Sequence, residues 1–487
     1  MQRAAFPFTN SFKYLLSIVA CRQGHFEQGT FLVSEFSEKL SRRIFIICAV
    51  IVVLGAAFLY GVIAQALNLF PAPQLRTVYG TVSTISESGL SDNPVGEHLQ
   101  PTRAQGEGVM VNTLPEDGAL VFMAGFFDEE NQIRLIRRDG TLVRKWSLDY
   151  TEHFPDAETR PCRRATPLRV DVHGALATPS GEIIFNYEYC GTVKLDACGG
   201  LIWRIAKPTH HSLVPARGGG YWLLGRYFWG TERNPDRFPP FSVSRHNRIM
   251  LEDTLLRIGE DGSVIEESSI PVMMQDSGLE ALLTATGERF EPISPGRTEL
   301  VHANKVAELS PEIADAYPLF EAGDLAISMR KLNLVMVVDP KTKRVKWHQT
   351  GPWLRPHDPE FRPDGRISVF NNNAYRTAYP DAKVDLNSPF STNIMVVDPV
   401  SRETEVVFGE RAGQEMLSVI RGQHELLDED GMLITEFDAG RVLQVTAEGE
   451  IVWEYVNRYD DEFVGEITNA MIYPEDYFEG GLPACSP

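Results

Sequence analysis

The sequence predicts an all-β protein, a six-bladed β-propeller, preceded by a single N-terminal transmembrane helix. Two observations predict this class. A turn followed by an apolar strand recurs six times after residue 110, and one long apolar run without a charge stands near the N-terminus. Repeats of roughly 45 to 80 residues that each hold several strands are typical of blades packed around a central channel.

The apolar run covers residues 44–64, IFIICAVIVVLGAAFLYGVIA, with 21 positions and no charge. A helix of that length crosses the roughly 30 Å hydrocarbon layer of a membrane. The triplet Ala64-Gln65-Ala66 resembles a signal-peptide cleavage site, but the run is longer than the usual core of a cleaved signal peptide. We therefore expect an uncleaved anchor over residues 44–66.

Basic residues lie on one side of this anchor. Lys39, Arg42 and Arg43 precede it, and the next basic residue is Arg76. By the positive-inside rule, residues 1–43 lie in the cytoplasm and the rest of the chain lies on the extracytoplasmic, periplasmic side.

The remaining chain divides into a linker and the propeller. Residues 67–110 are rich in Ser, Pro, Gly and Asp, and we expect a linker and an arm that leads into a propeller of residues 111–487. The tail EFVGEITNAMIYP, residues 462–474, has strand character. It can complete a blade together with the N-terminal part, which would close the ring.

The repeated phrase has six copies, most of which end in tryptophan. They are RDGTLVRKW, CGGLIW, EDGSVIEES, DPKTKRVKW, DPVSRETEVVF and AEGEIVW. A second turn-and-strand phrase usually precedes the first, as PSGEIIFNYEY, RGGGYWLLGRY, AGDLAISMR, PDGRISVFNNN and EDGMLITEF. The long insertion 267–320 interrupts this pattern, and its segments GLEALLTATGERF and PEIADAYPLFEAG are helix-like.

Charge and cysteine content limit the partners and the compartment. The formal net charge of -20 argues against a nucleic-acid partner. Cys162, Cys190, Cys198 and Cys485 follow the anchor, in what should be an oxidising compartment. Four cysteines permit three pairings, and a local bridge between Cys190 and Cys198 across GTVKLDA is one option. No CxxC pair or close Cys/His cluster indicates zinc.

Several of the 11 histidines occupy the same place in the repeat. His173 and His357 each stand eight residues before a turn glycine, His424 stands seven before one, and His210 and His211 lie in the corresponding region. Because the innermost strand of each blade lines the axial channel, these side chains should converge at the channel mouth. At any single position, a histidine that caps a turn or bonds a neighbouring blade is the alternative.

Two further segments add polar groups to this set. LVHANKV supplies His302 and Asn304, and LAISMR ends in Arg330. An arginine in an apolar strand is costly unless it meets an anion or a carboxylate. Arg330 is therefore a candidate to bind an anion, with a structural ion pair as the alternative.

These pieces, HHS, HAN…ISMR and HDPEFRPDGRISVFNNN within a sixfold repeat, resemble the bacterial arylsulfate sulfotransferase family over roughly residues 110–475. The resemblance implies a six-bladed propeller that transfers a sulfuryl group without a nucleotide donor. It implies that His357 is the nucleophile and that His302 and Arg330 are catalytic. Of the paired histidines it implies His211 rather than His210.

The chemistry of sulfuryl transfer agrees with these roles. A neutral imidazole can attack the sulfur of an aryl sulfate and form an N-sulfated intermediate, from which a phenol then takes the group by a ping-pong route. Arg330 suits the sulfuryl oxygens, and His302 or His211 can move the proton of the leaving and accepting oxygens. We expect His210, Asn304 and His424 to contact substrate.

No cofactor is expected. The sequence has no GxxxxGK[ST] loop for a nucleotide and no GxSxG elbow for a serine nucleophile, and the proposed chemistry needs no metal. Two other classes are the alternatives. One is a non-catalytic propeller that acts as a membrane-anchored binding or scaffold module. The other is a quinone-dependent dehydrogenase propeller, which is disfavoured because the repeats number six rather than eight and no vicinal cysteine pair occurs. Protein partners are not predicted.

Overall fold

The computed structural model describes residues 30–67, 94, 98–103, 106–156, 162, 166–229, 250–284, 298–373, 392–428 and 431–485. It divides into two compact units, Met1–Ser91 and Asp92–Pro487. The first unit contains helix α1 (Thr30–Leu67), in which Leu40–Ala64 is long and apolar enough to cross a membrane. Large apolar side chains along this stretch are exposed, as expected for a candidate membrane span.

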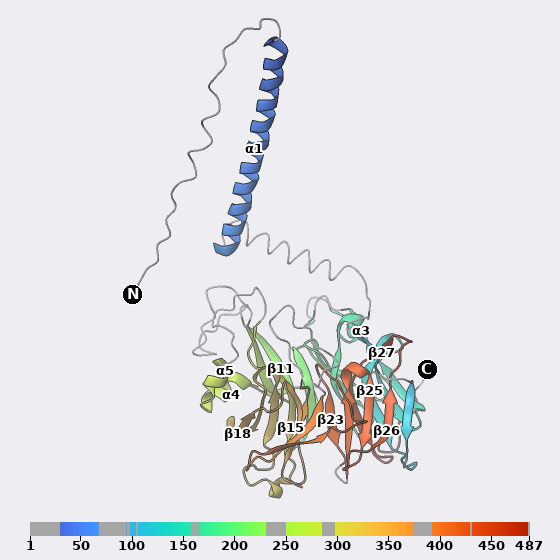
Figure 1. The fold of residues 1–487 in the computed structure, drawn as a ribbon. Coiled ribbons are helices and arrows are strands. Elements are labelled where there is room, and N and C mark those ends of the chain that lie inside the picture. The colour runs from blue at the N-terminus through green and yellow to red at the C-terminus, as the bar shows by residue number, and fades with distance from the viewer. Residues whose placement is uncertain are drawn as a thin grey trace. The chain divides into compact units, whose positions relative to one another are not determined.

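The second unit is a six-bladed β-propeller, which confirms the predicted fold class (Figure 1). We number the blades along the chain. Blade 1 contains β6 (Val172–Ala177), β7 (Ile183–Tyr187), β8 (Gly191–Leu195) and β9 (Leu201–Ile205); blade 2 contains β10 (Thr209–Pro215), β11 (Tyr221–Trp229), β12 (Met250–Ile258) and β13 (Val264–Ser269); blade 3 contains β15 (Ala303–Glu308), β16 (Leu325–Met329), β17 (Leu334–Asp339) and β18 (Arg344–Thr350). Blade 4 contains β19 (Pro356–Phe361), β20 (Ile367–Asn371), β21 (Asn393–Val397) and β22 (Thr404–Phe408); blade 5 contains β23 (Gln423–Leu426), β24 (Met432–Glu436), β25 (Arg441–Val445) and β26 (Ile451–Val456); blade 6 contains β28 (Ile467–Tyr473), β3 (Leu120–Phe127), β4 (Glu130–Arg137) and β5 (Leu142–Ser147).

The ring closes where the two ends of the propeller sequence meet in blade 6. The C-terminal strand β28 is innermost and pairs antiparallel with β3, with Tyr473 opposite Leu120. Figure 1 shows these late red strands beside the early cyan ones. Three short strands add to this seam: β1 (Leu99–Pro101) pairs with β27 (Phe463–Gly465), and β2 (Gly108–Asn112) extends blade 5 beside β26. The closure that the tail sequence predicts is confirmed.

Packing between neighbouring blades explains the tryptophan-ended phrase. Its six copies are the fourth strands of the six blades, counted from the axis, or the turns that lead into them; in blade 5, β2 lies outside this strand. The indole N–H of Trp146 donates to the Ala197 carbonyl, and that of Trp203 to the Glu260 carbonyl, in each case in the next blade. Buried apolar residues form six clusters, one at each contact between adjacent blades. Each repeat therefore buries its apolar faces against its neighbours.

Among the described residues of the propeller unit, helices are few and short. They are α3 (Tyr150–His153), α4 (Ile270–Asp276) and α5 (Glu280–Thr284), with 3-10 turns η1 (Pro167–Arg169), η2 (Ala314–Ala316), η3 (Arg330–Leu332) and η5 (Phe437–Ala439). The helix expected over PEIADAYPLFEAG is wrong, because only the turn η2 forms there. Pro318 disfavours helical backbone at the preceding residue, and Tyr317 is extended. Of GLEALLTATGERF, the part after Thr284 lies outside the described residues.

Two disulfides connect distant segments, Cys162 to Cys190 and Cys198 to Cys485. The local bridge between Cys190 and Cys198 is therefore wrong. The strand β8 lies between these two residues, and its five residues alone span about 16 Å at roughly 3.3 Å each, whereas bridged Cα atoms lie within about 7 Å. Cys198–Cys485 instead fastens the C-terminal tail to blade 1 beside the closure seam.

Candidate active site

The innermost strands bring the predicted histidines together at one end of the axial channel. In five of these strands the pairing register shifts near the first residues, which is the mark of a β-bulge. Bulges re-aim side chains at the rim of a barrel or next to an active site. Three residues at this end, His211, His302 and Asp358, have left-handed backbone with φ of 53°, 53° and 45°. Such backbone is uncommon for residues other than glycine and concentrates at functional sites.

His357 presents an unbonded nitrogen in this region. It lies in β19 and is 3% exposed. Its Nδ1 lies 3.0 Å from the Arg355 carbonyl, which accepts only if Nδ1 carries the proton, so the lone pair is on Nε2. The Nε2 atom has no hydrogen-bond partner among the described residues. Burial, and then the positive charge of Arg330, hold the pKa of His357 well below its usual value. The imidazole is therefore neutral and nucleophilic at neutral pH.

The loop before His357 is fixed by side chains from the same region. The Leu354 N–H donates to Oδ1 of Asn371, and the Arg355 N–H donates to Oδ1 of Asn333. These two hydrogen bonds hold the carbonyl of Arg355 in place. The tautomer of His357 is thus set by a loop that polar side chains keep rigid.

His302 and Arg330 come from blade 3, next to His357. Nδ1 of His302 donates to Oε2 of Glu299 at 2.7 Å, and its Nε2 is buried without a partner in the described part of the chain. Burial, followed by the charge of Arg330, lowers the pKa of His302 to about 4 although Glu299 opposes this. Burial opposes ionisation of Glu299, but the hydrogen bond from His302 and the charge of Arg226 outweigh it and lower the pKa of Glu299 to about 2.

Arg330 lies at the end of β16, where the turn η3 begins. Its backbone N–H donates to the His302 carbonyl at 3.1 Å, which places the two residues side by side. The side chain is half-buried, and it forms no ion pair with any carboxylate that the structure describes. A guanidinium near two neutral imidazoles and without a carboxylate partner is suited to bind an anion.

His211 occupies the centre of the histidine group. Its ring lies 4.2 Å from His173, 5.1 Å from His302 and 6.3 Å from His357, measured between ring centroids. His210 donates from Nε2 to the Gly225 carbonyl at 3.2 Å, so its Nδ1 accepts from Nδ1 of His211 at 3.0 Å. Burial and the neighbouring histidines hold the pKa of His211 well below its usual value. His210 itself is fully buried behind His211.

Asn304 lines the cavity described below, whereas His424 lies behind it. Nδ2 of Asn304 donates to the Pro356 carbonyl at 2.8 Å, which ties blade 3 to the start of β19. His424 lies 3.1 Å from Asp358 through Nδ1 and 2.7 Å from the Ser368 hydroxyl through Nε2. Its ring is fully buried and does not line the cavity described below. Asp358 also pairs with Lys305 at 2.6 Å, and Lys305 and His424 hold the pKa of this buried carboxyl low although its burial opposes them.

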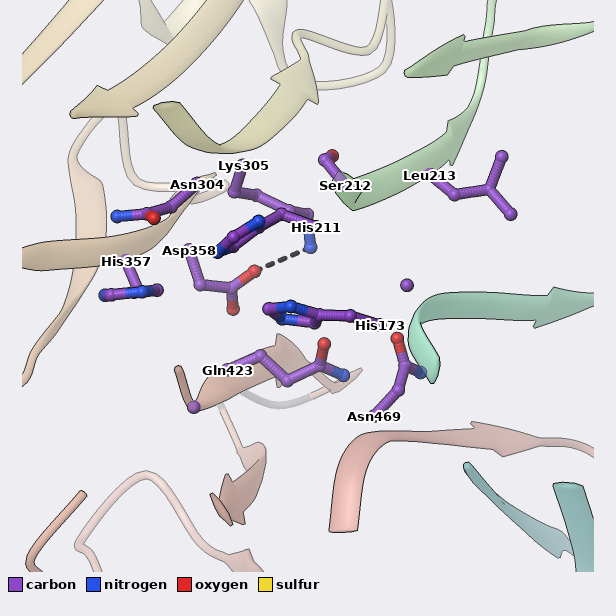
Figure 2. Close-up of a pocket in the computed structure, with 12 residues that line it drawn as sticks. His173, His211, Ser212, Leu213, Asn304, Lys305, His357, Asp358, Gln423 and Asn469 are labelled. Carbon is purple, nitrogen blue, oxygen red and sulfur yellow. Dashed lines mark hydrogen bonds and ion pairs between the residues drawn. The ribbon is translucent and has the colours of Figure 1, made fainter. Parts of the chain in front are cut away.

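Three of the predicted site residues, His211, Asn304 and His357, line a cavity of about 340 Å³, part of it open solvent (Figure 2). The other four, His302, Arg330, His210 and His424, do not line it. Figure 2 shows the imidazoles of His173, His211 and His357 turned toward the same space, from strands of three different blades. The lining residues come from all of the blades: His173, Gly174, His211, Ser212, Leu213, Asn304, Lys305, His357, Asp358, Gly422, Gln423 and Asn469. The cavity is thus polar and rich in neutral nitrogen bases.

Two carboxylates in this region had no sequence signal. Glu188 lies in the turn between β7 and β8, 3.6 Å from Nδ1 of both His173 and His211. Glu299 lies in β14 (Thr298–Glu299), a two-residue strand that pairs with β12. Glu188 lies in the repeated phrase PSGEIIFNYEY, but nothing in that pattern marks it as a site residue, and Glu299 lies outside the repeat. Glu188 lies behind His173 and His211, which line the cavity, and Glu299 lies behind His302, which does not.

The fold and the site define a class, a six-bladed propeller that brings several histidines and an arginine together at its channel mouth. The chain belongs to the Arylsulfotransferase (ASST) family, whose sequence model matches residues 177–458, more than half of the chain. This range includes His211, His302, Arg330 and His357. Family membership supports an arylsulfotransferase-like function and thus a sulfotransferase enzyme.

Comparison with individual proteins gives less information about function than the family match does. A search of curated proteins gives no match. Solved structures that resemble the chain include a protein of unknown function from Bacteroides caccae, with 13% identity, coverage of 72% of this chain and 98% of that chain, and a TM-score of 0.43. Virginiamycin B lyase from Staphylococcus aureus has 11% identity, 62% and 84% coverage and a TM-score of 0.33. A streptogramin B lyase has 12% identity, 75% and 96% coverage and a TM-score of 0.37. Scores this low carry no argument about function.

Proposed function

We propose that the protein transfers a sulfuryl group from a phenolic sulfate ester to a phenolic acceptor through an N-sulfated His357. The observation that carries this proposal is the state of His357. Its Nδ1–H is held by the Arg355 carbonyl, and its Nε2 is buried and unbonded among the described residues, beside the charge of Arg330. A neutral imidazole in this state can attack sulfur without first losing a proton.

In the first half-reaction, Nε2 of His357 forms a bond to sulfur while the bond from sulfur to the phenolic oxygen breaks. The electron pair of that bond leaves with the phenolate. Arg330 donates hydrogen bonds to the sulfuryl oxygens, where a planar fork of N–H groups fits best. Because an anion nearby favours the charged form of an imidazole, the bound ester raises the proton affinity of His302 and His211. Either of these imidazoles can pass a proton to the leaving oxygen.

In the second half-reaction, the oxygen of an acceptor phenol attacks the sulfur and the N–S bond breaks. The electron pair returns to Nε2 of His357, and the phenolic proton passes to an imidazole of the cavity. The two steps therefore restore the enzyme to its starting state. His210 and His424 contribute by orienting His211 and Asp358, and Asn304 by fixing the strand that carries His357.

We also propose that the propeller lies on the extracytoplasmic, periplasmic side, with residues 44–66 as an uncleaved anchor and residues 1–43 in the cytoplasm. Lys39, Arg42 and Arg43 on one side of the apolar run support this orientation. The two disulfides of the propeller support it as well, because disulfides persist in oxidising compartments. Residues 67–110 then form the linker and the arm that leads into the propeller.

The test uses the full chain in detergent with 4-nitrophenyl sulfate. Without an acceptor, we expect a burst of one nitrophenolate per enzyme and a sulfuryl adduct that peptide mass spectrometry assigns to His357. With a phenol present, release should become continuous, and His357→Asn should abolish both signals. His348→Gln, on the outermost strand β18, is the matched control and should keep full activity. Absence of both turnover and adduct in the wild type would contradict the proposal and favour the binding or scaffold module.

A further inference from the structure

His173 belongs to the histidines that the repeat singles out, yet the family resemblance assigns it no role. We propose that His173, backed by Glu188, is the acid–base residue for the ester oxygen: it protonates the leaving phenolate and deprotonates the acceptor phenol. This role rests on the proposed sulfuryl transfer and refines it. His302 and His211 would then mainly stabilise the sulfuryl group itself.

The first observation that supports this role is the position of blade 1 in the ring. Neighbouring blades follow the order β6, β10, β15 and β19 along their innermost strands, so blade 1 is the third blade from blade 4 in a ring of six. His173 therefore faces His357 across the axis. Displacement at sulfur, like displacement at phosphorus, places the nucleophile and the leaving oxygen roughly in line on opposite sides of the centre. The ester oxygen then points away from His357 and toward blade 1.

His302 and Arg330 lie in the neighbouring blade 3, beside His357 rather than opposite to it. Groups placed beside the line of attack face the non-bridging oxygens of the sulfuryl group. This is where hydrogen-bond donors stabilise charge in the transition state. The geometry thus separates the group that neutralises charge from the group that moves the proton.

Glu188 determines which ring nitrogen of His173 carries the proton. Burial opposes ionisation of Glu188, but the Arg421 guanidinium at 2.6 Å and His173 keep its pKa well below the usual value. Its Oε2 lies 3.6 Å from Nδ1 of His173, so the N–H of the ring belongs on Nδ1, facing the carboxylate. The lone pair is then on Nε2. Burial lowers the pKa of His173 although Glu188 opposes this, so Nε2 takes a proton from solvent when the anionic ester binds, passes it to the leaving phenolate, and regains a proton from the acceptor phenol. Glu188, Arg421 and the neighbouring Asp171 form a fixed ionic support behind the ring.

A purely structural histidine would be bonded differently. His98, which is also fully buried, uses both ring nitrogens, at 3.0 Å to Glu466 and at 3.0 Å to the Leu168 carbonyl. His173 is only 8% exposed, yet its Nε2 has no hydrogen-bond partner within the described part of the chain, and its ring lines the cavity. Buried polar groups are almost always bonded, so such an exception indicates a functional role.

Local backbone geometry also fixes His173 in place. Gly174 has a φ of 86°, and a Cβ atom there would lie 1.9 Å from the His211 carbonyl oxygen. Only glycine lets the β6 bulge come this close to β10. The His173 ring is thereby held 4.2 Å from the His211 ring. His173, Glu188 and His211 also lie close enough to hold a metal ion, but Arg421 already neutralises Glu188 and would repel a cation.

The test compares two donors in His173→Gln and His173→Asn, with the full chain in detergent. Nitrophenolate leaves without a proton, whereas the phenolate of phenyl sulfate needs one. We expect the burst with 4-nitrophenyl sulfate to stay within about threefold of wild type, and the burst with phenyl sulfate to fall by about 10²-fold or more. Transfer from the pre-sulfated enzyme to phenol should fall by a similar factor.

Three outcomes would overturn the proposal. An equal loss with both donors indicates that His173 only positions other groups, and no loss in any step indicates that it is not needed. Absence of a burst in the wild type removes the sulfuryl transfer on which the role depends. Thermal unfolding of each variant, with His348→Gln as the control, separates misfolding from a chemical effect.

Discussion

Replacement of Arg330 tests the charge balance of the site most directly. The guanidinium has no ion pair among the described carboxylates, so Arg330→Gln leaves no buried carboxylate without its partner. The free energy of unfolding should therefore change by no more than about 0.5 kcal/mol, as for a substitution that breaks no buried contact. Any large effect on catalysis would then come from the lost charge and not from loss of structure.

Two effects on catalysis follow from the position of Arg330. Loss of a preorganised donor to the sulfuryl oxygens should lower kcat/KM by about 10²- to 10³-fold, about 3 to 4 kcal/mol. The positive charge also adds to burial in lowering the pKa of His357. Its removal raises that pKa, and because only the neutral imidazole attacks sulfur, the acid limb of the kcat/KM profile should move to higher pH. Arg330→Lys keeps the charge but not the planar fork, so it should lose less activity and show a smaller pH shift.

The assay is the burst of nitrophenolate from 4-nitrophenyl sulfate, followed across pH by stopped flow in wild type, Arg330→Gln and Arg330→Lys. Urea unfolding of the same samples reports their stability. If kcat/KM of Arg330→Gln stays within about fivefold of wild type, Arg330 does not bind the sulfuryl group. If the acid limb moves to lower pH instead, the assignment of neutral His357 as the nucleophile is wrong.

Three other predictions concern the supporting residues. Glu299→Gln removes the charged acceptor of the His302 Nδ1–H and should lower kcat/KM by up to about 10²-fold, at the low end of what an acid–base group contributes; an unchanged rate would remove His302 from the mechanism. Joint replacement of Cys198 and Cys485 by serine opens a loop with a sequence separation of 287 residues and should cost up to about 5 kcal/mol in the chain-entropy model; an unchanged denaturation midpoint would contradict this. Burial lowers the pKa of His98, but its hydrogen bond to Glu466 outweighs this and the net pKa is raised, so its stabilising effect is complete below pH 6.5 and is lost as pH rises through the folded pKa. The stability gap between wild type and His98→Gln in urea unfolding should then be larger at pH 6 than at pH 9, and a gap that grows with pH would refute the pairing.

Much of the fold follows from the sequence because each blade repeats a local pattern. A glycine or aspartate turn followed by an apolar strand marks the fourth strand of every blade, counted from the axis, and Trp146, Trp203 and Trp453 bond the neighbouring blade at equivalent places. The second phrase was found in five blades. Its sixth copy, PEDGALVFMAGFF, contains β3 and lies far from the other strand that completes blade 6. Because blade 6 combines strands from both ends of the propeller sequence, a search for repeats along the chain does not find it as one unit.

The errors concern long-range or context-dependent features. The partner of Cys198 lies 287 residues away, and nothing local to the cysteine indicates it. The segment around Tyr317 has helix-forming residues, but Pro318 interrupts them. For the site, His357, His302, Arg330 and His211 were assigned through the family resemblance, and the structure brings all four to one end of the channel. Their carboxylate partners Glu188 and Glu299 were missed because Glu188 stands at the end of a repeated phrase with nothing to mark it and Glu299 stands outside the repeat.

The bulges explain why the repeat alone does not reveal the site. In a regular strand only every second side chain faces the channel. In β10 the register shifts between His210 and Leu213, and His211 is left unpaired with left-handed backbone; in β19 the same happens at Asp358, between His357 and Pro359. Two successive polar residues can then serve one site: His210 lies behind His211, whereas His357 and Asp358 both line the cavity.

The bulges let blades of the same architecture contribute different side chains to the site. His211 faces the cavity while His210 fixes its proton, and His357 faces it while Asp358 joins Lys305 and His424. Among the described residues that line the cavity, the one carboxylate is Asp358, and it is paired with Lys305 and His424. In a protein with a net charge of -20 this pairing matters, because an unpaired carboxylate at the cavity would repel an anion. Glu188 and Glu299 do not line the cavity, and each lies against a histidine.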